Sequence, residues 1–302
     1  MTKIAFIGNS EPPDRLLAIF RKMTPNSSGI WGQLEGVDAY EKADLYVVID
    51  YLPNDLKGVI PEGKCVFIGA HPETMCAYHS QVKYKGFKML DIANGPGFCE
   101  WWLNLDYTYL SNLQPPTKVK ELACVMSDAD SQFYHKARRE HLAKFVLENA
   151  SKIGFNLYGR ITPFTEPMKQ YYRGPCGSNN PSGAFSSGGN DHMSGKEEVL
   201  RDHKYTLEYD CTGEHYISER FFDDLLLWSR PIYWGGKGAE KYLPENSFDK
   251  LNIAGDGSDV IEFIKNNTYE KYLPEMKEAR RILLNELNLW PRIHKGIFGV
   301  CK

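Results

Sequence analysis

The chain alternates short apolar runs with helical patterns, and this alternation is what most constrains its fold. Three runs, Ile4–Ile7, Leu45–Ile49 and Cys65–Ile68, have the length of buried strands, and Gly or Asp follows each of them directly. Between the first two lies Asp14–Lys22, whose apolar side chains recur at helical spacing. Continuous apolar strands joined by crossover helices are typical of parallel sheets that are covered on both faces. The N-terminal part therefore predicts an α/β unit.

The same pattern starts again after a proline pair at residues 115 and 116, which is typical of a linker. It predicts a strand at Leu122–Met126, a helix at Phe133–Ser151 and a second strand at Phe155–Tyr158. The predicted fold is α/β, with two Rossmann-like domains that face a cleft, where ligands of such folds bind. We place the domains at residues 1–115 and 116–302, with the last helix free to return to the first domain.

Charge and composition exclude several classes of function. The 302 residues carry 36 Lys+Arg and 39 Asp+Glu, a formal net charge of −3 that gives no bulk attraction to nucleic acids or anionic membranes. The 7 cysteines are dispersed without a CxxC pair, so neither a zinc ribbon nor a redox pair is indicated. No apolar run reaches the length of a signal peptide or a membrane span. We therefore expect a soluble, cytoplasmic protein with no transmembrane segment and no nucleic-acid partner.

Two short motifs are weak signals for ligands. Gly58–Lys64 matches the GxxxxGK pattern of a phosphate-binding loop, but a cysteine and a strand follow it instead of Ser or Thr and a helix. Asp128 and Asp130 form a DxD motif that offers two carboxylates to a divalent metal, although Asp after a strand is also an ordinary helix N-cap. The 8 histidines form no HExxH motif. We assign no phosphate site to the first motif and keep a metal at the second as an alternative.

The stretch from Thr162 to Gly195 is rich in Gly, Pro, Ser and Asn. Such a composition predicts a long loop, and long loops in compact domains often carry function. We expect this loop beside the cleft, with a neutral surface insertion as the alternative.

The segment Lys204–Ile253 holds the richest constellation of polar residues. It predicts a strand at Tyr205–Tyr209, a helix that begins after Ser218, and a second strand at Pro231–Trp234 that opens into glycines and a further helix. Both helices would begin at the same edge of a parallel sheet. Helix N-termini present free N–H groups and partial positive charge, and so form anion sites.

Glu219 and Arg220 stand at the start of the first of these helices. A basic residue in a first turn opposes the helix dipole, but a bound pyrophosphate would reverse that effect. Glu219 would then accept hydroxyl groups of a sugar or ribose. A solvated surface pair of Glu and Arg is equally supported by these residues alone.

Four blocks in this segment resemble the α1,3/α1,4-fucosyltransferase family, the family 10 glycosyltransferases. The family pattern Phe-x-Leu-x-Phe-Glu-Asn-Ser corresponds to residues 205–212, and Tyr-(Val/Ile)-Thr-Glu-Lys corresponds to Tyr216–Arg220. The pattern (Val/Ile)-Pro-(Val/Ile)-Tyr-Trp-Gly corresponds to Arg230–Gly235, and Tyr-(Ile/Leu)-Pro-x-Asn-Ser-Phe to Tyr242–Phe248. Because all four blocks occur in the family's order, the resemblance is specific.

Upstream the likeness to the family is weaker. A strand that ends in Ser-Asn corresponds to Ser127-Asp128, and a helix with a phosphate-binding arginine to Arg138-Arg139. The Glu-Ser-Pro element that carries the family's proposed base is matched best by His71-Pro72-Glu73.

The resemblance implies a GT-B fold and an inverting glycosyl transfer in a single displacement. A base in the first domain takes the proton of the acceptor hydroxyl while the nucleotide diphosphate leaves; by this resemblance the base is Glu73, with His71 as the second choice. Basic side chains and helix N-termini neutralise the leaving group, so no cofactor is required and a divalent metal is not favoured. The donor-binding residues implied are Arg139, Arg138, Ser127, Tyr216, Glu219, Arg220, Asp210 and Gly235.

The implied partners are a GDP- or UDP-sugar donor and a glycan acceptor. L-Fucose from GDP-fucose is the donor of the family, but Asp210-Cys211 replaces Glu-Asn and Arg220 replaces Lys, which leaves UDP-sugars open. Two alternatives remain. One is a metal-assisted glycosyltransferase that uses a UDP-sugar through Asp128 and Asp130, and the other is a non-catalytic glycan-binding protein of the same fold.

Overall fold

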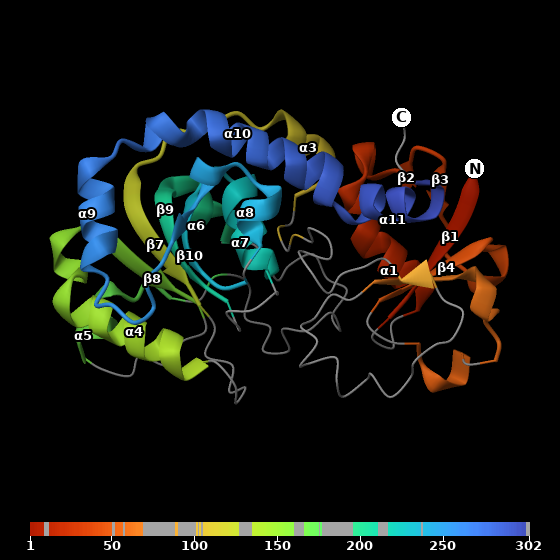
Figure 1. The fold of residues 1–302 in the computed structure, drawn as a ribbon, viewed down its shortest axis with the longest axis horizontal. Coiled ribbons are helices and arrows are strands. Elements are labelled where there is room, and N and C mark those ends of the chain that lie inside the picture. Colours follow the sequence, from red (N-terminus) through yellow and green to blue (C-terminus); the bar gives the residue numbers. More distant parts are fainter. Residues whose placement is uncertain are drawn as a thin grey trace.

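The computed structural model describes residues 1–8, 12–49, 52–56, 58–68, 88–89, 101, 103, 105–126, 135–159, 166–174, 176, 196–210, 217–236 and 238–299. The chain forms two sheets, one from each half, which lie side by side with helices around them (Figure 1). None of the helices in these ranges is long and apolar enough to cross a lipid bilayer.

The N-terminal sheet has six strands in the order β2-β3-β1-β4-β5-β6. Its neighbouring strands run parallel, apart from the antiparallel pair β2–β3. The side chains of Ile4–Ile7 are fully buried, as expected for a strand with both faces covered. The elements of this unit are β1 (Thr2–Ile7), α1 (Pro13–Phe20), β2 (Ile30–Trp31), β3 (Leu34–Gly36), β4 (Leu45–Ile49), β5 (Cys65–Ile68), β6 (Lys88–Met89) and α3 (Tyr107–Asn112).

The C-terminal sheet has five strands in the order β11-β10-β9-β7-β8, all parallel. Its elements are β7 (Lys120–Val125), α4 (His135–Glu148), β8 (Phe155–Tyr158), α5 (Glu166–Tyr171), α6 (Lys196–Asp202), β9 (His203–Tyr209), α7 (Glu219–Leu226), β10 (Arg230–Trp234), α8 (Ala239–Tyr242), β11 (Asp249–Lys250) and α9 (Ser258–Asn266).

Both sheets have the same doubly wound topology. When the strands of each unit are ranked along the chain, with β2 set aside, the order across both sheets is 2-1-3-4-5. The strand order therefore reverses between β1 and β4 in one sheet and between β7 and β9 in the other. Ligands of doubly wound sheets bind outside the carboxyl ends of the strands at such a point. This topology confirms the predicted class, α/β with two Rossmann-like units as in the GT-B type, while the domain boundary at residue 115 and the cleft stay predictions.

Two local predictions differ from the structure. The stretch predicted as one long loop contains α5, where the buried side chain of Met168 gives the segment an apolar anchor. The helix predicted after Gly236 is the single turn α8, because Leu243 takes an extended conformation before Pro244 and the chain cannot continue as a helix.

The last helices tie the two units together. α10 (Leu273–Ile282) continues through a π-helical turn at Leu283–Leu287 into α11 (Leu289–Phe298), and Figure 1 shows this run extending from one sheet to the other. In α11, Trp290 donates from Nε1 to the carbonyl of Phe20 at 2.9 Å, and its ring meets that of Phe6 at 5.5 Å. The final helix is thus fixed on the N-terminal unit.

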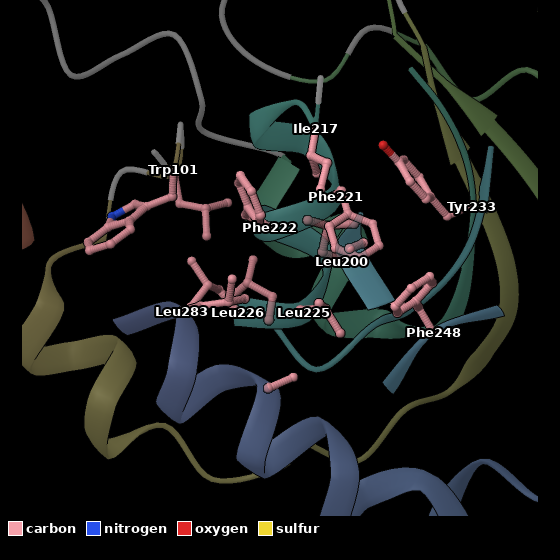
Figure 2. Packing of buried hydrophobic residues seen from close by; sticks show 14 of the residues in the cluster. Trp101, Leu200, Ile217, Phe221, Phe222, Leu225, Leu226, Tyr233, Phe248 and Leu283 are labelled. Carbon is pink, nitrogen blue, oxygen red and sulfur yellow. The ribbon is translucent and has the colours of Figure 1, made fainter. Parts of the chain in front are cut away.

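Helix α7 is held in the core of the C-terminal unit on its apolar side. Phe221, Phe222, Leu225 and Leu226 are buried, as the spacing in the sequence predicts. Figure 2 shows them packed among side chains from the sheet and from the helices around it. This packing fixes the position of the polar residues at the start of the helix.

Candidate functional site

The switch point between β7 and β9 is the place where the topology predicts a ligand. Residues 127–134, which follow β7, and 211–216, which follow β9, lie outside the described part of the chain. The described part of the site consists of the carboxyl ends of β7, β9 and β10 and the helices α4, α6 and α7. Its chemistry depends on charged side chains that these elements bury together.

The first turn of α7 is anchored to the end of β9. Ser218 occupies the predicted N-cap position, but its side chain makes no capping bond to the helix. Instead, its backbone N–H donates to Oδ2 of Asp210 at 3.0 Å, which fixes where the helix starts. Glu219 and Arg220 follow in the first turn, and both are half-buried.

The Arg220 side chain, 15% exposed, faces the sheet rather than the surrounding solvent. Its Nε donates to Oε1 of Glu208 at 2.9 Å, and its Nη2 donates to the carbonyl of Tyr209 at 2.9 Å and lies 3.5 Å from Oδ1 of Asp210. The predicted surface pair of Glu219 and Arg220 is therefore not what the structure shows. Arg220 is bound to two buried carboxylates at the end of β9.

A second set of buried charges lies behind this contact. Lys196 of α6 donates from Nζ to Oδ2 of Asp223 at 2.5 Å, and Thr206 of β9 donates from its hydroxyl to Oδ2 of Asp224 at 2.6 Å. We call Glu208, Asp210, Asp223 and Asp224, with the cations Lys196 and Arg220, the carboxylate network.

Burial shifts the titration of this network toward neutral carboxyl groups. Burial raises the pKa of Glu208 well above its usual value, although Arg220 opposes the shift. Burial likewise raises the pKa of Asp224 to about 7, against the opposing charge of Lys196. The pKa of Asp210 is also raised by burial, with Arg220 again lowering it. Burial thus disfavours the ionised form of these carboxyl groups, and the charges of Arg220 and Lys196 oppose that effect.

The hydroxyl of Tyr233 connects Asp210 to the turn after β10. Tyr233 donates a short hydrogen bond to Oδ2 of Asp210 and accepts one from the N–H of Gly236 at 2.8 Å. Gly235 lies so close that a Cβ there would stand 2.1 Å from the Tyr233 hydroxyl and 2.6 Å from Cβ of Asp210. Packing alone therefore requires glycine at this position, and contact of Gly235 with a donor stays a prediction.

Two of the predicted donor-binding arginines influence the buried thiol of Cys124 in β7. Burial raises the pKa of this thiol, Glu208 raises it further, and Arg220 and Arg138 of α4 lower it. The side chain of Arg138 is buried. Arg139 is half-buried beside Arg138.

Several predicted site residues lie outside the described part of the chain. The candidate bases Glu73 and His71, the donor-binding Ser127 and Tyr216, and the metal-binding alternative Asp128 and Asp130 are among them. Among the described residues, no group of three or more His, Cys, Asp or Glu side chains is arranged to hold a metal ion.

A hollow of about 550 Å³ elsewhere on the molecule contains none of the predicted site residues. It is lined by Asn26, Asp106, Thr108, Tyr109, Asn112, Leu113 and Gln114.

Sequence reasoning missed most of the carboxylate network. Asp223 and Asp224 interrupt the apolar stripe of α7, and two carboxylates inside such a stripe were a usable signal of a buried polar cluster. Glu208 stands between Leu207 and Tyr209 in β9, and a carboxylate between two apolar strand residues is a similar signal. Lys196 carried no such signal, because α6 contributes it from a distant part of the sequence.

Comparisons with known proteins give distant structural similarities only. No family model and no curated protein matches this chain. A solved α1,3-fucosyltransferase is 14% identical, with 92% of this chain and 81% of that chain covered at a TM-score of 0.48. T4 phage β-glucosyltransferase in complex with UDP-glucose is 11% identical, with 97% of this chain and 98% of that chain covered at a TM-score of 0.48. A glycosyltransferase from Rickettsia africae is also 11% identical, with 97% of this chain and 96% of that chain covered at a TM-score of 0.45.

Proposed function

We propose that this chain is a glycosyltransferase that transfers a sugar from a nucleotide donor to a hydroxyl group of a glycan. The observation that carries the proposal is the place of Arg220, in the first turn of α7 and bound at the carboxyl end of β9, beside the switch point of the C-terminal sheet. Guanidinium groups match the geometry of phosphate oxygens with paired N–H donors. Such a group at the N-terminus of a helix forms a setting suited to a diphosphate.

The charge balance of the carboxylate network supports this role for Arg220. Four buried carboxyl groups would repel a diphosphate if all were ionised. Burial raises the pKa of Glu208, Asp210 and Asp224 and so disfavours the ionised forms that would repel the diphosphate. A bound diphosphate and the network would then share the charge of Arg220.

The proposed reaction is an inverting displacement. The acceptor oxygen forms a bond to the anomeric carbon of the sugar, the bond from that carbon to the diphosphate oxygen breaks, and the acceptor proton passes to a base. Arg220, Arg138 and the N–H groups at the start of α7 stabilise the negative charge that develops on the diphosphate. Glu73 is the proposed base and His71 the second choice, so Glu73→Gln should abolish transfer while donor binding persists.

GDP-fucose is the donor that the four sequence blocks favour, and a UDP-sugar is the alternative. The test is a thermal-shift screen with GDP, UDP, GDP-fucose and UDP-glucose, followed by assays of donor hydrolysis and of transfer to a panel of glycans. We expect one nucleotide family to raise Tm and its sugar conjugate to be consumed. A protein that binds glycans but leaves every donor intact would be a glycan-binding protein instead.

Chelation with EDTA distinguishes the metal-assisted mechanism from the favoured one. Under the favoured mechanism, transfer persists in EDTA because side chains and helix N–H groups neutralise the leaving group. Complete loss of activity that Mn²⁺ restores would favour a metal held by Asp128 and Asp130.

A further inference from the structure

We propose that Asp210 and Tyr233 are positioning residues that fix the start of α7 against the turn after β10. This inference rests on the proposed function and refines it, because it separates the residues that hold the donor site in shape from those that bind the diphosphate.

The carboxylate of Asp210 is 0% exposed, and groups of the protein surround it. Its Oδ2 accepts the N–H of Ser218 and the hydroxyl of Tyr233, while its Oδ1 faces Arg220. The backbone N–H of Asp210 donates to the carbonyl of Trp234 at 2.8 Å. Oδ2 is thus held by two hydrogen bonds, while Oδ1 lies 3.5 Å from Nη2 of Arg220 and accepts no hydrogen bond among the described residues. A ligand could take Oδ2 only if one of its buried bonds were given up.

Tyr233 links Asp210 to the turn after β10. Its ring is buried against Phe221 at 4.5 Å and Phe248 at 6.3 Å between centroids. Figure 2 shows the hydroxyl pointing away from Phe248. Because the ring is fixed by packing, the hydroxyl stands at one place between Asp210 and the N–H of Gly236.

The side chains of Asp210 and Tyr233 therefore join three segments at the carboxyl edge of the sheet. Asp210 directly follows β9, Ser218 is the N-cap of α7 and Gly236 lies in the turn after β10. Gly235 fits the same cluster, since any Cβ there would collide with Tyr233 and Asp210. Arg220 follows the anchored Ser218 by two residues, about half a helical turn, so the cluster sets the position of Arg220 and with it the geometry of the diphosphate site.

The experiment compares Tyr233→Phe with Tyr205→Phe, which removes the same atom. Tyr205 is buried in β9, and its hydroxyl has no hydrogen-bond partner among the described residues. The substrate is GDP-fucose or, if wild type does not hydrolyse it, UDP-glucose. We expect Tyr233→Phe to raise the donor KM or lower kcat/KM about tenfold, as the loss of a hydrogen bond to a charged group implies, and Tyr205→Phe to leave both within twofold.

A second readout does not depend on turnover. Amide hydrogen exchange should become faster at Ser218 and Gly236 in Tyr233→Phe, and should stay at the wild-type rate in Tyr205→Phe. Should Tyr233→Phe fail to fold, Asp210→Asn is measured by the same two readouts, since it keeps the shape of the side chain and changes its hydrogen bonds to Ser218 and Tyr233.

The outcomes separate the inference from the proposed function. Unchanged exchange at Ser218 and Gly236 overturns the positioning role, and so do kinetic constants that match wild type. If wild type consumes no nucleotide sugar, the proposed function fails and the exchange rates alone decide whether the two residues position these segments.

Discussion

The two ends of α7 bury charge in opposite ways. At its N-terminal end, Arg220 contacts carboxylates of β9 in the carboxylate network. At its C-terminal end, Arg280 donates from Nη2 to the carbonyl of Leu110 at 2.6 Å and stacks on the Trp228 ring at 4.5 Å. Lys118 donates from Nζ to the carbonyls of Leu200 and Leu227 at 2.5 and 2.9 Å. We call Lys118 and Arg280 with these carbonyls the carbonyl cluster.

The C-terminal end of α7 is the end that is built for stability. Cations near the C-terminus of a helix complement its dipole, so the carbonyl cluster agrees with the local rule. It also holds Trp228, whose φ of +63° is strained for a bulky residue and whose Nε1 donates to the carbonyl of Leu113 at 3.0 Å. Arg220 in a first turn opposes the dipole and needs buried carboxylates around it. Proteins break such rules mostly at functional sites.

The largest expected effect comes from Arg220→Ala. We expect kcat/KM to fall by roughly 100-fold, because developing diphosphate charge loses its partner. The unfolding free energy should also fall by about 3–5 kcal/mol, because Glu208 and Asp210 stay buried without the cation. Steady-state kinetics with the donor and urea unfolding measure the two effects.

The matched control is Arg281→Ala, which removes the same groups from an exposed pair of contacts with Glu278 and Glu286. Arg281→Ala should lower the free energy of unfolding by less than about 1 kcal/mol, as for other exposed ion pairs. A loss of kcat/KM under threefold in a folded Arg220→Ala protein would remove Arg220 from the diphosphate site.

Arg280→Met tests the other end of the helix. The variant loses the carbonyl bonds and the stacking on Trp228, so we expect the unfolding free energy to fall by about 3 kcal/mol. The donor KM should stay unchanged, because the carbonyl cluster lies at the far end of α7. A KM that rises fivefold with little change in stability would show that the two ends are not independent.

Asp224→Asn probes the pH dependence of the carboxylate network. The folded-state pKa of Asp224 is about 7, raised from 3.8 chiefly by burial. The folded state therefore binds more protons than the unfolded state between these values, and stability falls as pH rises from about 4 to about 7. The variant cannot titrate there, so the decline should shrink by roughly 2 kcal/mol in urea unfolding measured at pH 5, 6, 7 and 8. Parallel profiles for the two proteins would assign the decline to other groups.

The sequence predicted the fold better than the site, and the reason is physical. Strands such as Leu45–Ile49 and Cys65–Ile68 were predicted to the residue, because burial on both faces leaves a continuous apolar run. The apolar face of α7 and the place of Arg220 at its start also followed from local spacing.

The contacts of Arg220 could not be predicted in the same way. The contacts of Arg220 with Glu208 and Asp210 depend on how the end of β9 is placed under α7. The pair Lys196–Asp223 joins the two helices that precede and follow that strand in the sequence. Sequence periodicity reports which face of an element is buried. It does not report which polar groups meet there, because those pairings are set by tertiary packing.

The last expected effect belongs to Lys118 in the carbonyl cluster. Burial lowers its pKa from 10.5 to about 7, so the folded state binds fewer protons than the unfolded state between these values. The titration of Lys118 should therefore raise stability by roughly 2 kcal/mol between pH 7 and pH 9. Lys118→Met should remove this rise in urea unfolding at pH 7, 8 and 9, and an unchanged rise would contradict it. Because Asp224 acts with the opposite sign below pH 7, each of the two substitutions should flatten the pH profile only on its own side of neutral pH.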